Sequence, residues 1–221
     1  MDDDISDILA SVSAPLPSQR KLDLQALTRA WVNERTSPTL LPYPSQLIDR
    51  VTDRIKKQIE TIEEMTSDMD PKSNFILVVL QTELERFKFL VRSFLRARLA
   101  KIDKFPYHYR DLALSDPNIL SHLEQQYLQS HQALLASHYH ASFLSIFPQG
   151  LQKLDDTTGL SMIDRPEEDS AVFCRVLRDA GGVVIQSEGG AGEVELTRGD
   201  VWVLRWRAVK DAVVRGDVEL L

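Results

Sequence analysis

The sequence predicts an α+β protein, in which an N-terminal all-α helical bundle domain is followed by a small C-terminal β-rich domain. Three observations predict this arrangement. Apolar residues recur at helical spacing through most of residues 22–150, short strand-like segments separated by glycines follow residue 168, and a segment rich in Asp, Glu, Thr and Pro lies between them. We therefore predict a flexible tail at 1–21, a helical domain at 22–150, a linker at 151–168 and a β domain at 169–221.

Prolines mark the boundaries of the predicted helices, because proline cannot continue a helix but suits its first turn. Pro15 and Pro17 separate the tail from the first helix, and Ser45 is expected to cap the second helix after Pro44. Pro117 is expected in the first turn of the fourth helix. The predicted helices cover approximately residues 22–35, 45–68, 73–102 and 115–147.

The third predicted helix carries more apolar side chains than one short neighbouring helix covers. Its apolar band is wide, and further apolar residues, such as Ile76 and Phe89, extend the band beyond one face. We therefore expect this helix to contact either several helices or another chain.

A basic stripe follows one flank of the third helix, where Lys88, Arg92 and Arg96 recur at i, i+4 and i+8. Such a stripe beside an apolar band is typical of a solvated or ion-paired flank. Contact with a polyanion such as DNA, or with an acidic partner, is the alternative.

The C-terminal residues predict five short strands and one short helix. A glycine-rich segment at 187–192 lacks the Lys and Ser/Thr of a phosphate loop and precedes a strand, which predicts a hairpin turn. Because so small a β domain is marginal alone, we expect it to dock on another surface. The predicted strands are Ala171–Leu177, Val183–Gln186, Glu193–Leu196, Val201–Trp206 and Asp217–Leu221, and the helix is Ala208–Val214.

Composition and charge narrow the range of possible functions. A formal net charge of −7 argues against a protein that mainly coats nucleic acid, although a local basic face is compatible with it. Cys174 is the single cysteine, the N-terminus is acidic, and no apolar run is long enough to cross a bilayer. We expect a soluble protein of a reducing intracellular compartment.

No sequence pattern indicates catalysis. The five histidines lack the i, i+4 spacing with an intervening Glu that helical zinc proteases use, and Cys174, in a predicted strand, is expected to be a buried structural residue. Adjacent acidic pairs such as Glu63 and Glu64 fall in polar segments, where nothing separates their pKa values for acid–base catalysis. We therefore predict no enzyme, no catalytic, metal-binding or cofactor-binding residue, and no cofactor.

Several segments, spread in order over nearly the whole chain, resemble the Sld-five subunit of the eukaryotic GINS complex. They are residues 27–34 with Pro38 and Leu40–Leu41, then 85–86, 93–105, 151–155, 169–176 and 216–221. The resemblance implies a non-enzymatic subunit of a compact heterotetramer of four related chains. It also implies membership, with the MCM ring and the Cdc-forty-five protein, of the replicative CMG helicase. The implied role is that of a nuclear scaffold in initiation and elongation of chromosomal DNA replication.

The same resemblance implies that the apolar bands of the long helices face sister subunits, and that the β domain docks through its strands and carboxyl end. A subunit that contacts DNA directly through the basic stripe is the alternative. The residues expected at subunit interfaces are Phe87, Val91, Phe94, Leu95 and Leu99 on the third helix, and Val218, Leu220 and Leu221 at the carboxyl end.

The N-terminal stretch is acidic and amphipathic. Its apolar residues recur at i, i+3, i+4 and i+7, although the stretch is too short to be a stable helix alone. It resembles the peptide with which some fungal members of this family bind the trimeric Ctf-four replisome hub, and a disordered acidic tail is the alternative. The residues expected to bind the hub are Asp4, Ile5, Asp7, Ile8, Leu9 and Val12.

Overall fold

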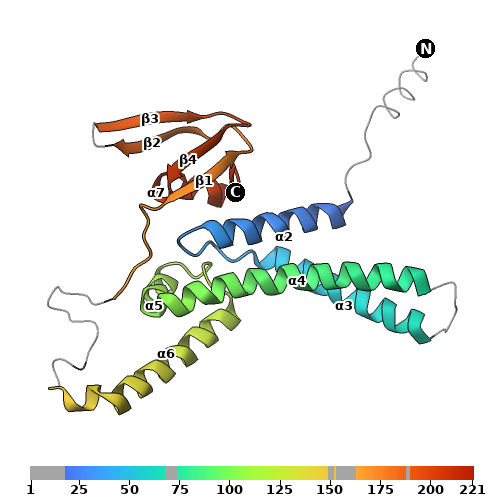
Figure 1. Ribbon diagram of the computed structural model, residues 1–221, viewed down its shortest axis with the longest axis horizontal. Coiled ribbons are helices and arrows are strands. Elements are labelled where there is room, and N and C mark those ends of the chain that lie inside the picture. Colours follow the sequence, from blue (N-terminus) through green and yellow to red (C-terminus); the bar gives the residue numbers. More distant parts are fainter. Residues whose placement is uncertain (1–17, 68–73, 149–151, 153–162, 188–189) are drawn as a thin grey trace.

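The computed structural model describes residues 18–67, 74–148, 152, 163–187 and 190–221, and every structural statement below concerns these residues. Its fold class is the predicted one, since helices form the N-terminal part and a small strand-containing region follows (Figure 1). The helices of the N-terminal part are α2 (Gln19–Thr36), α3 (Ser45–Ser67), α4 (Asn74–Lys104), α5 (Pro106–Ser115) and α6 (His122–Ser142), with a 3₁₀ turn at Leu144–Ile146.

Helix α4 is the central element of the helical part, and α2 and α3 lie along it (Figure 1). Leu27 of α2, Val51 of α3, and Phe87 and Phe94 of α4 are buried in one apolar cluster. The wide apolar band of α4 is therefore shared between two helices of the same chain. This agrees with the expectation that one short neighbour would not cover it.

The fourth helix predicted from residue 115 is wrong in its first part, because residues 116–121 form a loop, and the helix that precedes this loop, α5, was not predicted. Pro106 lies in the first turn of α5, whereas Pro117 lies in the loop that follows this helix. Helix α6 begins after Ser121. The Ser121 hydroxyl accepts a hydrogen bond from the Glu124 amide (3.2 Å), and the Glu124 carboxylate accepts one from the Ser121 amide (2.9 Å). This capping box fixes the start of α6, because it satisfies two amides that no helical carbonyl reaches.

The C-terminal part contains the predicted strands and short helix. Strands β4 (Val201–Arg205), β1 (Ala171–Val176) and β5 (Val218–Leu220) form an antiparallel sheet in the order β4-β1-β5. Strands β2 (Gly181–Ser187) and β3 (Gly190–Leu196) form the predicted hairpin, in which Ser187 pairs with Gly190. Helix α7 (Trp206–Arg215) follows β4 directly and ends at Gly216, whose φ of 80° favours glycine.

The β domain packs on the C-terminal half of α2 and on the loop after it, as Figure 1 shows. The Leu220 amide donates a hydrogen bond to Asn33 Oδ1 (2.8 Å), so β5 is joined to α2. The Trp206 indole donates one to Thr39 Oγ1 (2.8 Å), and both partners are buried. The small domain thus docks on the helical part of its own chain.

Candidate interaction surfaces

A buried arginine joins four segments of the helical part. Arg98 of α4 is fully buried, and its guanidinium donates to Glu34 Oε2 (3.0 Å) and to Glu124 Oε1 (2.7 Å) and Oε2 (3.2 Å). It also donates to the carbonyls of Leu41 (2.7 Å) and Ile119 (2.6 Å). Burial alone would lower the pKa of Arg98, but its bonds to Glu124 and the charge of Glu34 outweigh this effect, and the pKa is raised.

Lys101 lies one turn further along α4 and extends this network. Its ammonium donates to Glu34 Oε1 (2.7 Å), Ser37 Oγ (2.8 Å) and the Thr39 carbonyl (2.9 Å). Burial lowers the pKa of Lys101 in spite of the Glu34 charge. Arg98 and Lys101 therefore hold the segment after α2 in place, and that segment carries Thr39, the partner of Trp206.

Only part of the basic stripe is free of ion pairs with described residues. Lys88 forms an ion pair with Glu85 (3.0 Å), whereas Arg92 and Arg96 are exposed and make no ion pair with any described residue. An exposed pair of arginines is compatible with an ion-paired flank against an acidic partner and with contact to DNA. Contact of the stripe with a polyanion stays a prediction.

Four of the residues expected at subunit interfaces lie inside the chain's own core. Phe87 and Phe94 are buried between α4, α2 and α3, and Val218 and Leu220 are buried between the sheet and α7. Their side chains are at most 4% exposed, so they offer a sister subunit little surface in this conformation, and their contact with one stays a prediction. A broad apolar band packs first against the helices and strands of its own chain, because these are always present.

The other four expected interface residues remain accessible in part. Val91, Leu95 and Leu99 are half-buried and pack against the apolar clusters of the helical part. Leu221, after β5, keeps about half of its side chain in solvent. Their contact with a sister subunit stays a prediction.

The first turns of α4, at the end of the helical hairpin that α3 and α4 form, expose a cluster of apolar side chains that we call the hairpin-end surface. It consists of Phe75 (78% exposed), Ile76, Val78 and Val79. Arg20, at the start of α2, pairs with Glu83, so α2 begins opposite that position. Residues 74–82 of α4 therefore have α3 beside them but not α2, so no described helix covers this apolar cluster.

Two further apolar surfaces lie on α6 and on the outer face of the sheet. On α6, which projects away from α4 in Figure 1, Leu123 and Leu134 are exposed, and Ile146 follows in the 3₁₀ turn. On the outer face of the sheet, Phe173 of β1 and Val203 of β4 are cross-strand neighbours and both are exposed. Exposed apolar clusters of this kind are typical of surfaces that other chains cover.

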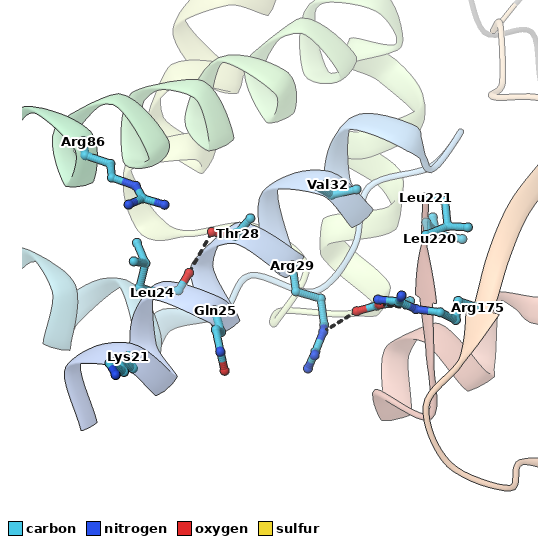
Figure 2. A pocket seen from close by; sticks show the side chains of 11 residues that line it. Lys21, Leu24, Gln25, Thr28, Arg29, Val32, Arg86, Arg175, Leu220 and Leu221 are labelled. Carbon is cyan, nitrogen blue, oxygen red and sulfur yellow. Dashed lines mark hydrogen bonds and ion pairs between the residues drawn. The ribbon is translucent and has the colours of Figure 1, made fainter. Parts of the chain in front are cut away.

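A groove of about 830 Å³ runs between α2, α4 and the β1–β5 side of the sheet; we call it the α2 groove (Figure 2). Figure 2 shows Arg86 of α4 and Arg175 of β1 near opposite ends, with residues of α2 between them. The groove is lined by Lys21, Leu24, Gln25, Thr28, Arg29, Val32, Arg86, Arg175, Glu219, Leu220 and Leu221.

Among the described residues that line the α2 groove, Glu219 is the one acidic residue, and two arginines bind it. Arg29 Nε donates to its Oε2 (2.8 Å) and Arg175 Nε donates to its Oε1 (2.8 Å). Burial alone would raise the pKa of Glu219, but the hydrogen bonds and charges of Arg175 and Arg29 outweigh it, and the pKa is lowered. The ion pairs join α2, β5 and β1.

No group of three or more His, Cys, Asp or Glu side chains in the described part of the chain could hold a metal ion. Cys174 is buried in the sheet, and burial raises the pKa of its thiol, so its surroundings disfavour the reactive thiolate. The helices with described coordinates include none that is both long and apolar enough to span a bilayer.

Several predicted features lie outside the described residues. They include the proposed hub-binding residues, Asp4, Ile5, Asp7, Ile8, Leu9 and Val12, and most of the linker at 151–168. Sequence reasoning missed the Arg98 network and the α2 groove. The signal for the first was present, since Arg98 stands four residues from Phe94 and from Ile102 on the apolar face of α4.

Two family models match the chain. One, described as the GINS complex protein helical bundle domain, matches residues 50–143, and the other, the C-terminus of DNA replication complex GINS protein SLD5, matches residues 166–221. The protein of that name from Chaetomium globosum is 49% identical over 99% of this chain and 100% of its own length. The Yarrowia lipolytica protein is 39% identical over 98% of this chain and 84% of its own length. The Arabidopsis thaliana protein is 32% identical over 90% of this chain and 91% of its own length.

Proposed function

Because this chain belongs to the SLD5 family of GINS subunits, which are named as parts of a DNA replication complex, we propose that it is a non-catalytic scaffold subunit of the GINS heterotetramer. In this role it holds other proteins in place and performs no chemistry itself. The three sister GINS subunits are its direct partners. Its place of action is the nucleus, where chromosomal DNA is replicated.

The observation that carries the proposal is the hairpin-end surface. Phe75, Ile76, Val78 and Val79 stand together on exposed turns of α4 with no helix over them in the described part of the chain. Burial of apolar area contributes about 25 cal/mol per Å², so a sister subunit that covers these side chains gains affinity from each of them. The α6 and sheet surfaces give further contact area on other sides of the molecule.

We further propose that the assembled heterotetramer joins the MCM ring and the Cdc-forty-five protein in the CMG helicase, and acts in both initiation and elongation. Support for this finer role comes from the family membership and from the several separate apolar surfaces. A subunit that touches more than one neighbour needs surfaces that point in different directions. The hairpin-end, α6 and sheet surfaces belong to different elements of the molecule.

Co-purification tests the scaffold proposal. Phe75→Asp combined with Val79→Asp places two carboxylates on the hairpin-end surface, and recovery of the sister subunits with the tagged chain should fall at least about tenfold. The matched control is Lys57→Asp with Thr61→Asp, which places two carboxylates at the same i, i+4 spacing on an exposed face of α3. Equal recovery with both double variants would contradict the proposal.

The N-terminal stretch is proposed to bind the trimeric Ctf-four hub through Asp4, Ile5, Asp7, Ile8, Leu9 and Val12. A labelled peptide of residues 1–18 is titrated with the hub, with Ile8→Ala and Leu9→Ala together as the variant. We expect the variant to lose binding, because two of the four apolar anchors are removed. Unchanged affinity would end this part of the proposal and leave the scaffold role untouched.

A further inference from the structure

The α2 groove carries a positive charge that the described residues do not neutralise. Of the residues with described positions, four cations line it, Lys21, Arg29, Arg86 and Arg175, against the single carboxylate of Glu219. Arg29 and Arg175 share that carboxylate, whereas Lys21 and Arg86 make no ion pair with a described residue. In a chain of net charge −7, this groove is a local excess of positive charge, which attracts acidic groups.

Apolar side chains lie among these cations. Leu24 and Val32 of α2, with Leu220 and Leu221 at the carboxyl end, line the same groove. Figure 2 shows Leu24 toward the Arg86 end and Leu221 toward the Arg175 end. A ligand that fits this lining carries apolar side chains together with carboxylates, which are the features of an acidic amphipathic peptide.

We propose that residues 1–12 of this chain dock into the α2 groove when no other protein holds them. The first 17 residues contain four aspartates and no lysine or arginine, which complements the four cations of the groove. Their apolar residues Ile5, Ile8, Leu9 and Val12 recur at i, i+3, i+4 and i+7, and so match its apolar lining.

The chain connectivity allows this docking. Residue 18 precedes α2 directly, and the groove begins within one turn of it, at Lys21. Residues 13–17 span at most about 17 Å when extended, which is enough to reverse the chain direction. The groove follows α2 from Lys21 to Val32, about 18 Å of helix axis, and residues 2–12 would occupy about 16 Å as a helix.

Self-docking has a consequence for regulation. The tether keeps the tail close to its groove, so docking is intramolecular and needs little intrinsic affinity. A protein that captures the tail has to displace it from the α2 groove first. The groove and the external partner therefore compete for the same residues, and weakening the groove increases the apparent affinity of the partner.

Photo-crosslinking in the purified four-subunit complex tests this inference. The photoreactive residue p-benzoylphenylalanine replaces Ser6, which leaves the aspartates and apolar residues of the tail intact. Mass spectrometry then identifies the cross-linked peptides. We expect the main products to lie within the same chain, in α2, around Arg86, or in β1 and β5.

Three variants and a salt titration separate docking in the groove from other contacts. Arg86→Glu should reduce the yield of these products several-fold, and Arg86→Lys should retain the yield. The matched control is Arg96→Glu, on the same helix outside the groove, which should leave the yield unchanged. Raising the salt from 0.1 to 1 M should also reduce the yield, because the Debye length falls from about 10 to about 3 Å. The inference would be overturned if the main products joined the tail to a sister subunit, to a second copy or to another element. It would also be overturned if Arg86→Glu left the yield unchanged.

Discussion

At the scale of single residues, the Arg98 network shows why a charge inside a protein is retained only with its partners. Removing the guanidinium leaves Glu124 buried without a counter-charge and leaves Glu34 with Lys101 as its cation, which is costlier than exchanging the whole network for apolar groups. Arg98→Met should therefore lower the free energy of unfolding by about 3–5 kcal/mol. Chemical denaturation of the purified complex measures this change.

The matched control for that change lies half a turn away on the same helix. Arg96 is exposed, so Arg96→Met should alter the unfolding free energy by no more than about 0.5 kcal/mol. If the two methionine variants unfold alike, Arg98 does not carry the structural role that its hydrogen bonds indicate.

Glu219 gives a pH-dependent prediction. Its pKa in the folded chain is lowered, so its ion pairs contribute stability above the unfolded-state pKa, about 4.3, and this contribution is lost as the pH falls through the folded-state pKa. Glu219→Gln should therefore destabilise the protein at pH 7, and the difference from wild type should shrink below about pH 4. Denaturation midpoints at pH 7, 5 and 3.5 measure it, and a difference that grows on acidification would be the wrong sign.

Sequence reasoning predicted little at this scale, for a physical reason. Helical spacing places Arg98 on the same face as Phe94 and Ile102, but spacing does not show which carboxylates meet it. Glu34 and Glu124 are far from Arg98 in the sequence, and their approach depends on how α2 and α6 pack. The α2 groove was missed for the same reason, because its lining comes from both ends of the chain.

At the scale of elements, the hydrogen bond between β5 and α2 is one of the contacts that attach the β domain to the helical part. Asn33→Ala leaves the buried Leu220 amide without its acceptor, which costs about 1–3 kcal/mol. Exchange of the Leu220 amide hydrogen should become about tenfold to a hundredfold faster if the β domain opens locally. Gln25→Ala, an exposed change on the same helix, should leave the exchange rate unchanged, and equal rates in both variants would contradict this role.

Most helices and strands were predictable from local patterns. The periodicity of residues 45–68 and 73–102 predicted α3 and α4 closely, and all strands from β1 to β5 overlap a predicted strand. Helix α5 was not predicted, and the start of α6 was placed too early, because Pro117 resembles a helix start. The capping box at Ser121 and Glu124 was the sequence signal that would have placed it correctly.

At the scale of the whole molecule, the chain hides only part of its apolar surface. Helices α2 and α3 bury the middle of α4, including Phe94, but no described residue covers the hairpin-end surface of α4, the apolar surface of α6 or the outer face of the sheet. The sequence predicted a surplus of apolar area on the third helix, and the structure confirms it. It did not predict where the surplus lies, because the position depends on where α2 begins along α4.

The most direct test of the central claim, that sister subunits cover the hairpin-end surface, is hydroxyl-radical footprinting of the assembled heterotetramer. Phe75 and Phe94 lie on the same helix, and in the chain alone they are 78% and 1% exposed, respectively. Our account predicts that in the complex Phe75 is oxidised as slowly as Phe94. Oxidation of Phe75 at the rate of a solvent-exposed phenylalanine would contradict it.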